Sequence, residues 1–253
     1  IDEAIRQASQ AGVPAVLDLP RSFEFMSMED YEELYGTEWI ADDYCMNITS
    51  QITINGNGYS ISALGYSRIF NITGDNVVLN NLNLLYGNAS GKYDDDVNKG
   101  GAIFWAGKNG IINASTIAYN NAEYGAGIYL NVTALNAKIA NSTFIRNNAT
   151  KNGGAIDCNA PEMNLTNTRF ESNYADTGAA LCREVSATGG FGNNNTFVSN
   201  GAVSYGAALA WVKSEKININ HYTFIDNTAG LSGGAIYVGV GSGKCVVNNS
   251  YFE

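Results

Sequence analysis

Gly100-Gly101-Ala102-Ile103 is the stretch that decides the fold, because versions of it return along the chain at a nearly fixed interval. The other copies are Gly125-Ala126-Gly127-Ile128, Gly153-Gly154-Ala155-Ile156, Gly178-Ala179-Ala180-Leu181, Gly206-Ala207-Ala208-Leu209 and Gly233-Gly234-Ala235-Ile236. The final aliphatic residue falls at positions 103, 128, 156, 181, 209 and 236, so the steps are 25, 28, 25, 28 and 27 residues. This self-similarity indicates a repeat architecture.

A second motif, an apolar residue followed by x-x-Asn-x-Ala, interleaves with the first. Its copies begin at Phe144, Phe170, Phe197 and Phe224, with degenerate copies at Leu84 and Ile117 and a truncated one at Phe252. Between the motifs lie short runs of alternating apolar residues, without helical spacing. Three short strands per unit describe one coil of a parallel β-helix, with coils stacked about 4.8 Å apart. The sequence therefore predicts an all-β solenoid.

Two columns of aligned residues support the stack of coils. Five positions before the apolar residue of the second motif stand aliphatic residues, namely Leu79, Ile112, Ile139, Leu165, Ile219 and Val247. Three positions before it stand Asn81, Asn141, Asn167, Asn194 and Asn249, interrupted by Ala114 and His221. We expect the aliphatic column to be interior. We expect the second column to form turns, because Asn tolerates left-handed backbone and its side chains can hydrogen-bond along the axis.

Composition bounds the class of protein. The 253 residues are 45% hydrophobic and only 15% charged, with 28 Gly, 3 Pro and a net charge of −10. A net negative charge repels phosphate backbones and therefore disfavours nucleic acid as a partner. No signal peptide or membrane-length apolar run is present, so we expect no membrane insertion in this segment. Since the chain begins at Ile1 without Met, we expect a piece of a longer protein whose other domains carry targeting and anchoring.

Cysteines and sequons bear on the compartment. The four cysteines, Cys45, Cys158, Cys182 and Cys245, form no CxxC pair and their spacing does not predict zinc. Cys158 and Cys182 fall on consecutive coils, as buried thiols or as a disulfide. Candidate glycosylation sites are Asn47, Asn71, Asn88, Asn113, Asn131, Asn141, Asn148, Asn164, Asn194 and Asn248. They suit an extracellular surface glycoprotein, although a chain this rich in Asn, Ser and Thr also forms sequons by chance.

The chain is interpreted as one domain, 1–253, with three parts. Residues 1–12 predict a capping helix, with Ile1, Ala4 and Ile5 on one face and Gly12 at its end. Residues 24–45 form an acidic, aromatic insertion that contains Trp39 and serves either as a contact surface or as a solvated loop. Coils occupy residues 46–253.

A second insertion, residues 91–98, lengthens one coil. It carries Asp94, Asp95 and Asp96, whose carboxylates could bind calcium, the one cofactor that the sequence suggests. Their spacing fits no defined calcium loop, so an exposed acidic loop is the alternative interpretation. No other metal site is expected.

The repeats resemble those of a known class of surface proteins. Gly-Gly-Ala-Ile paired with Phe-x-x-Asn resembles repeats of the chlamydial polymorphic outer-membrane proteins. The fuller unit, with Ile52-Thr53-Ile54-Asn55-Gly56-Asn57-Gly58 ahead of repeats such as Phe144-Ile145-Arg146-Asn147-Asn148-Ala149, is similar to the adhesin-like surface proteins of methanogenic archaea. The resemblance covers about residues 50–253. It implies a single-stranded right-handed parallel β-helix on a secreted, cell-wall-associated protein that mediates attachment.

An enzyme is the first alternative, because the same fold houses polysaccharide lyases and hydrolases. The residues that follow each repeat's aliphatic are Phe104, Tyr129, Asp157, Cys182, Ala210 and Tyr237. Only one acid stands in that column, and Asp157 with Arg183 and Glu184 on the next coil is the closest approach to a catalytic set. Asp157 and Arg183 are interpreted instead as an ordinary surface pair. His221 is interpreted as a turn residue.

The same column offers candidates for ligand binding. Phe104, Tyr129 and Tyr237 would be exposed on a flat face if strand alternation points them outward, and Trp39 is a further candidate. The alternative interpretation is that these rings only shield the backbone. The predicted function is therefore non-enzymatic attachment, on a β-helical platform that binds cell-surface glycans or proteins of a partner cell. The alternatives are a polysaccharide lyase or hydrolase and a purely structural cell-wall stalk.

Overall fold

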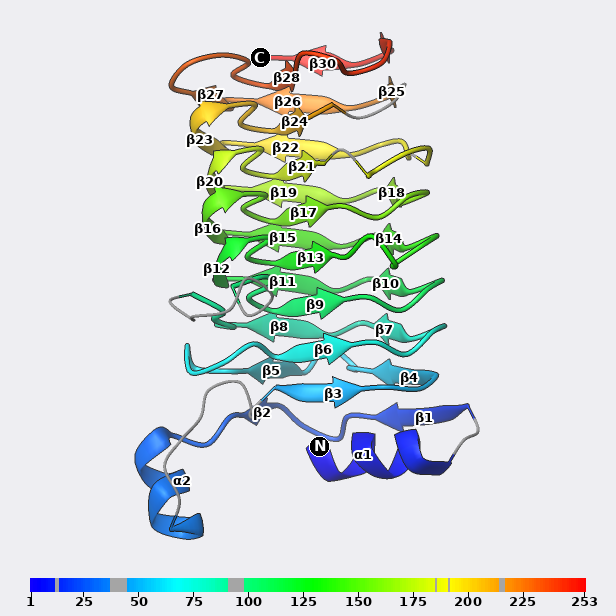
Figure 1. Cartoon of the computed structure of the whole chain (residues 1–253), viewed down its shortest axis with the longest axis vertical. Helices are drawn as coiled ribbons and strands as arrows, with labels where there is room; N and C mark the ends of the chain where they lie inside the picture. Colours follow the sequence, from blue (N-terminus) through cyan, green and yellow to red (C-terminus); the bar gives the residue numbers. More distant parts are fainter. Residues whose placement is uncertain (12–13, 37–44, 91–97, 185, 191, 214–216) are drawn as a thin grey trace.

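The computed structural model describes residues 1–11, 14–36, 45–90, 98–184, 186–190, 192–213 and 217–253. It is a parallel β-solenoid of about 7 turns with a short helix at its N-terminal end (Figure 1). The predicted solenoid is thereby confirmed. Among the described residues, no helix has the length and apolar character needed to span a membrane.

The strands form four long parallel sheets, A to D, and a short fifth sheet, E. Sheet A contains β1 (Ala15–Asp18), β4 (Ile52–Asn55), β7 (Val78–Asn80), β10 (Ile111–Asn113), β14 (Lys138–Ala140) and β18 (Asn164–Thr166). Sheet B contains β2 (Phe23–Glu24), β5 (Ser60–Ser62), β8 (Asn83–Leu85), β11 (Thr116–Ala118), β15 (Thr143–Ile145), β19 (Arg169–Glu171), β22 (Thr196–Val198), β26 (Thr223–Ile225) and β30 (Tyr251–Phe252). Sheet C contains β3 (Met46–Ile48), β6 (Phe70–Ile72), β9 (Ile103–Trp105), β13 (Ile128–Leu130), β17 (Ile156–Cys158), β21 (Leu181–Arg183), β24 (Leu209–Trp211) and β28 (Ile236–Val238). Sheet D contains β12 (Asn121–Tyr124), β16 (Asn148–Asn152), β20 (Tyr174–Thr177), β23 (Gly201–Tyr205) and β27 (Thr228–Ala229), and sheet E pairs β25 (Ile217–Asn220) with β29 (Cys245–Asn248).

Each coil visits the sheets in a fixed order. The first coils run from sheet A to B to C, as β4, β5 and β6 do, which is the predicted number of three strands. From β12 onward a strand of sheet D is added between B and C, so the coils β10–β13, β14–β17 and β18–β21 contain four strands. In the described residues the next coil has β22, β23 and β24 of sheets B, D and C, and β25 of the coil after it belongs to sheet E. The x-x-Asn-x-Ala motif supplies this extra strand, since its Ala lies in β12, β16, β20, β23 or β27.

The predicted interior columns are confirmed. Phe144, Phe170, Phe197 and Phe224 stack in succession, with ring centroids 5.0, 4.9 and 5.2 Å apart, and all are buried. The aliphatic column is in register, with Leu79 opposite Ile112 and Ile139 opposite Leu165. Val247 is the exception at 41% exposure, because it lies in the last coil and only one side of that coil is covered.

The predicted turn column is confirmed as well. Its members have positive φ angles between 47° and 57°, namely Asn81, Ala114, Asn141, Asn167, Asn194, His221 and Asn249. Some of the side chains form the expected exposed ladder, in which Asn141 Nδ2 donates to Asn113 Oδ1 and Asn167 Nδ2 donates to Asn141 Oδ1.

A second, buried ladder was not predicted. It is formed by the Asn of the second motif, at positions 120, 147, 173, 200 and 227. From Asn120 to Asn200, Nδ2 donates to Oδ1 of the next Asn and also to a backbone carbonyl of the preceding coil; Asn147, for example, reaches Ile117 O at 2.9 Å and Asn173 Oδ1 at 2.9 Å. Asn227 Nδ2 donates instead to the carbonyl oxygens of Phe197 and Ile225. The Oδ1 atom accepts from the backbone N–H of the preceding rung as well. The ladder holds the bend between sheets B and D.

The Gly that opens each copy of the first motif is required by two constraints. Gly153 and Gly178 have φ angles of +65° and +62°, a conformation that favours Gly. A Cβ on Gly178 would lie 2.8 Å from Cα and Cβ of Cys182. The turn from sheet D into sheet C therefore packs directly on the outer side of sheet C.

Two helices stand at the N-terminal end. Helix α1 (Asp2–Ala11) confirms the predicted helix, and its Ile5 is fully buried in the core with Leu19 and Ile48. Helix α2 (Met28–Tyr35) occupies part of the acidic insertion that was interpreted as a contact surface or a solvated loop. Ser27 caps it by accepting from the Asp30 N–H, and Gly36 ends it with φ 66°. Trp39 lies outside the described residues.

The buried ladder generates a stability prediction. Asn147→Ala removes bonds to Ile117 O, Asn120 and Asn173 and leaves buried backbone groups without partners, so we expect the free energy of unfolding to fall by at least about 3 kcal/mol. The neighbouring Asn148, the first residue of β16, is exposed, and Asn148→Ala should change the free energy of unfolding by less than about 0.5 kcal/mol. Chemical denaturation of both variants provides the measurement. Equal effects would contradict the role of the ladder.

Candidate functional site

An open groove follows the outer face of sheet A and has a volume of about 570 Å³. Its floor is a column of strand residues in register, Val78, Ile111, Lys138 and Asn164. Its edge is a column of turn residues that includes Asn76, Asn109 and Asn136. A second hollow of about 430 Å³ shares Asn164 and Gly190 with it and continues the polar surface toward Asn218 and Asn220.

The edge of the groove is an amide ladder. Asn109 Nδ2 donates to Asn76 Oδ1 at 3.2 Å, and Asn136 Nδ2 donates to Asn109 Oδ1 at 3.2 Å. The three side chains are exposed, and their backbones have φ angles of 55° to 61°. One N–H and one oxygen lone pair of the Asn109 amide remain for solvent or a ligand. The groove thus offers neutral donors and acceptors at the spacing of the coils.

The predicted sequon residues all lie within the described part of the chain. Exposed ones are Asn47, Asn141, Asn148, Asn164, Asn194 and Asn248, and half-buried ones are Asn71, Asn88, Asn113 and Asn131. Several side-chain amides are already engaged between coils, as in the bond from Asn71 Nδ2 to Asn47 Oδ1 at 2.8 Å. Their glycosylation stays a prediction. Asn164 stands in the groove itself.

The aromatic candidates do not form the expected exposed face. Tyr129 is buried at 8% exposure, so its predicted exposure is wrong. Its ring stacks on Phe104 with centroids 5.6 Å apart, and the ammonium of Lys99 lies over it at 5.2 Å. Tyr237 is half-buried and stacks on Tyr205 at 4.6 Å. These rings already have neighbours on their faces, which removes the flat platform that sugar stacking needs.

The predicted surface pair between Asp157 and Arg183 is also wrong, because the two side chains lie on opposite sides of sheet C. Asp157 is opposite Cys182 in register, whereas Arg183 is opposite Cys158 and Trp211. Asp157 and Arg183 are 1% and 2% exposed. Strand alternation therefore directs Arg183 into the core and Asp157 away from it.

Arg183 stabilises a loop from within. Its guanidinium donates to the carbonyl oxygens of Ala187, Gly189 and Gly190 at 2.8, 2.9 and 3.2 Å. On the same interior side, burial raises the pKa of Cys158 to about 11, and this thiol donates to Ala160 O at 3.4 Å. Both residues are structural in this position.

Asp157 instead lies beside Cys182 and Glu184. The carboxylate and thiol ligand atoms of these three residues are within 4.8 Å of one another. Asn152 Nδ2 donates to Glu184 Oε1 at 2.7 Å, and the Cys182 thiol lies 3.5 Å from the same oxygen. Burial raises the pKa of Asp157 well above its usual range; the nearby Glu184 carboxylate raises it further, and Lys99 opposes this. All four cysteines are free thiols.

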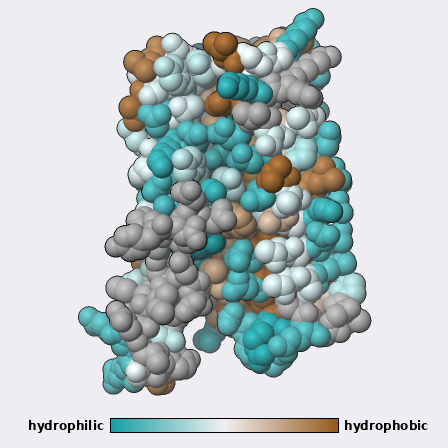
Figure 2. Space-filling view, viewed as in Figure 1, coloured by the Kyte–Doolittle hydropathy of each residue, from teal (hydrophilic) through white to brown (hydrophobic). Residues whose placement is uncertain are grey.

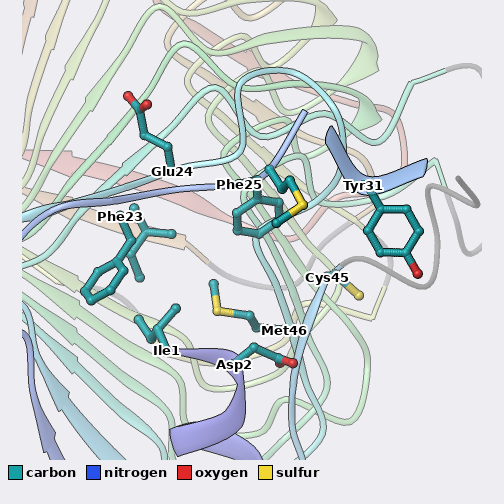
Figure 3. A pocket seen from close by; sticks show the side chains of 10 residues that line it. Ile1, Asp2, Phe23, Glu24, Phe25, Tyr31, Cys45 and Met46 are labelled. Atoms are coloured by element: carbon teal, nitrogen blue, oxygen red, sulfur yellow. The ribbon is translucent and has the colours of Figure 1, made fainter. Parts of the chain in front are cut away.

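A third feature is a pocket of about 500 Å³ near the two helices (Figure 3). Figure 3 shows Phe23, Phe25 and Met46 beside Ile1, with Tyr31 of α2 at one side. The proposed calcium ligands Asp94, Asp95 and Asp96, like Trp39, lie outside the described residues. His221 has φ 57°, in agreement with its interpretation as a turn residue.

The surface in Figure 2 is mostly polar along the stack, and hydrophobic atoms gather toward the end that carries the C-terminus. Leu231 and Val240, near that end of the chain, are 67% and 91% exposed. These exposed apolar residues flank β28, the strand at the edge of sheet C. They are therefore not counted as a site.

No family model, curated protein or solved structure matches this chain. The class that the structure defines is a parallel β-solenoid with a polar, amide-edged groove on one face.

The interior position of Arg183 generates a second prediction. Arg183→Met keeps an unbranched side chain in the core and removes the donors to three loop carbonyls, so we expect the free energy of unfolding to fall by about 3 kcal/mol. Limited proteolysis should cleave residues 186–190 faster. The control is Arg169→Met, whose side chain is 44% exposed in an ion pair with Glu171 and should matter by less than about 0.5 kcal/mol. Unchanged proteolysis in Arg183→Met would contradict the proposed contact.

Proposed function

We propose that this chain is a non-catalytic attachment domain that binds glycans along the groove on sheet A. The observation that supports the proposal is the amide ladder of Asn76, Asn109 and Asn136 beside an open floor. Sugars present hydroxyl groups that both donate and accept hydrogen bonds, as primary amides do. A rigid row of amides binds such a ligand without ordering flexible side chains first, which lowers the entropic cost of binding.

The shape and charge of the groove fit an extended, uncharged glycan. The floor column spans three coil steps from Val78 to Asn164, a length of about 14 Å. Lys138 and Glu162 place one charge of each sign in the groove. A polysaccharide chain of a cell wall or a partner cell could therefore lie along the axis, and the ladder would contact successive sugar units.

The extracellular location belongs to the same proposal. Ten sequons and an Asn-rich surface favour a secreted, cell-surface protein, of the type that the resemblance to archaeal adhesin-like proteins implies. A polysaccharide lyase or hydrolase is less well supported. The one acid of the aligned column, Asp157, is 1% exposed, so a sugar could not contact it without displacement of the residues that cover it.

Binding to an array of cell-wall and host glycans tests the proposal. We expect the wild-type chain to bind, and the double variant Lys138→Ala/Asn164→Ala to bind at least about tenfold more weakly, a loss of about 1.4 kcal/mol. Both side chains are exposed and neither has a positive φ, so the fold should be kept. Asn148→Ala, on sheet D, is the matched control and should bind normally.

Other outcomes would reject the proposal in distinct ways. Absence of binding by the wild-type chain would favour a purely structural stalk. Equal binding by the double variant would place the site elsewhere. Release of reducing or unsaturated ends from a bound glycan would show that the domain is an enzyme.

A further inference from the structure

The cluster of Asp157, Cys182 and Glu184 is produced by the register of sheet C. Asp157 of β17 is directly opposite Cys182 of β21. Glu184 follows two positions after Cys182, and strand alternation places it on the same side. Three potential ligands from two neighbouring coils thereby meet, with one ligand atom of each within 4.8 Å of the others.

The cluster contains a buried polar atom that no hydrogen bond explains. Asp157 is 1% exposed, and its Oδ1 atom has no hydrogen-bond partner. Cys182 beside it is fully buried, and the close approach of Gly178 to Cys182 leaves the pair little contact with water. An unpartnered carboxylate oxygen in such a place costs free energy unless a cation or proton compensates for it. Something other than the hydrogen bonds of the fold therefore has to satisfy this carboxylate.

We propose that Asp157, Cys182 and Glu184 bind a divalent transition-metal ion, of which zinc fits best. A thiolate is a soft ligand that calcium and magnesium do not favour, whereas zinc accepts sulfur and carboxylate oxygen together. In a tetrahedral zinc site the ligand atoms lie about 3.5 Å apart, from the usual Zn–O and Zn–S bond lengths. The distance between Cys182 Sγ and Glu184 Oε1 is already 3.5 Å, and the separations from Asp157, which are at most 4.8 Å, need to shrink by no more than about 1.3 Å for such a site.

The side chains around the cluster are suited to that contraction. Glu184 is half-buried, and Asn152 Nδ2 donates to its Oε1 at 2.7 Å, as outer-shell groups orient metal ligands. The ammonium of Lys99 acts on Asp157 electrostatically and lies over the ring of Tyr129. A bound ion would replace Lys99 as the positive charge that stabilises the Asp157 carboxylate. The exposed side of Glu184 would leave one coordination position of the ion open toward solvent. The inference is independent of glycan binding, which is proposed for the groove on the outer face of sheet A.

Titration of the metal-free, reduced chain with Co²⁺ tests the proposal, because a cobalt–thiolate bond produces charge-transfer absorption in the near ultraviolet. We expect one equivalent of Co²⁺ to give this absorption, and Zn²⁺ to displace it, in accord with its higher affinity for such ligands. Cys182→Ser should abolish the absorption. Cys158→Ser is the matched control, since Cys158 is an equally buried thiol on the adjacent coil that faces the core.

Two further variants guard against misfolding. Glu184→Gln changes a partly exposed side chain and should weaken Co²⁺ binding at least about tenfold, while circular dichroism remains that of the wild type. Asp157→Asn should weaken it similarly. The proposal is overturned if the wild-type chain gives no thiolate absorption, if Cys182→Ser retains it, or if a folded Glu184→Gln binds as tightly as the wild type. Cobalt bound through Cys45 or Cys245 would be recognised by its persistence in Cys182→Ser.

Discussion

The buried amide ladder at positions 120, 147, 173, 200 and 227 is the interaction on which the rest of the structure depends. A primary amide can donate and accept along the axis while its second N–H donates to a backbone carbonyl at the bend. A single Asn in each of these coils therefore satisfies the buried backbone groups of the bend. The arrangement works only if each coil returns the Asn to the same place. The near-constant period of the sequence from residue 120 onward is the consequence, and the insertion at residues 91–98 lies ahead of the first Asn of the ladder.

Much of this fold can be predicted from the sequence because interior columns repeat. The Phe column and the turn column were assigned from spacing alone, and the positive φ of Ala114 and His221 shows that position in the coil outweighs residue type. The ladder escaped prediction for a physical reason. An Asn suits both an exposed turn and a buried bend, and the sequence does not state which of the two environments its side chain meets.

The sites were predicted less well, because alternation gives the side of a strand but not what covers that side. The aligned column correctly placed Tyr129, Asp157 and Cys182 together on the outer side of sheet C. Those side chains are nevertheless buried, since the Gly turn of the first motif packs on them. Arg183 was misassigned because it was paired with Asp157 on the basis of opposite charge. It lies one position after Cys182, the residue opposite Asp157, and strand alternation therefore turns its side chain inward. The groove on sheet A could have been found from the row of Asn76, Asn109 and Asn136. These residues are recognised as a row only when the register of the strands in sheet A is known.

The outer faces of sheets A and C thus differ in solvent access, and this difference determines which kind of ligand each face is expected to bind. On sheet A the amides are open to water, where a neutral hydrogen bond has a small net value and many of them in a rigid row are needed to hold a ligand. On sheet C the turn at Gly178 excludes water, so a single unpaired carboxylate has a large electrostatic effect and favours one compact cation. Extended polar ligands are therefore expected on the first face and an ion on the second. Because the coils are stacked rigidly, either face can be altered by substitution while the ladder between sheets B and D stays unchanged.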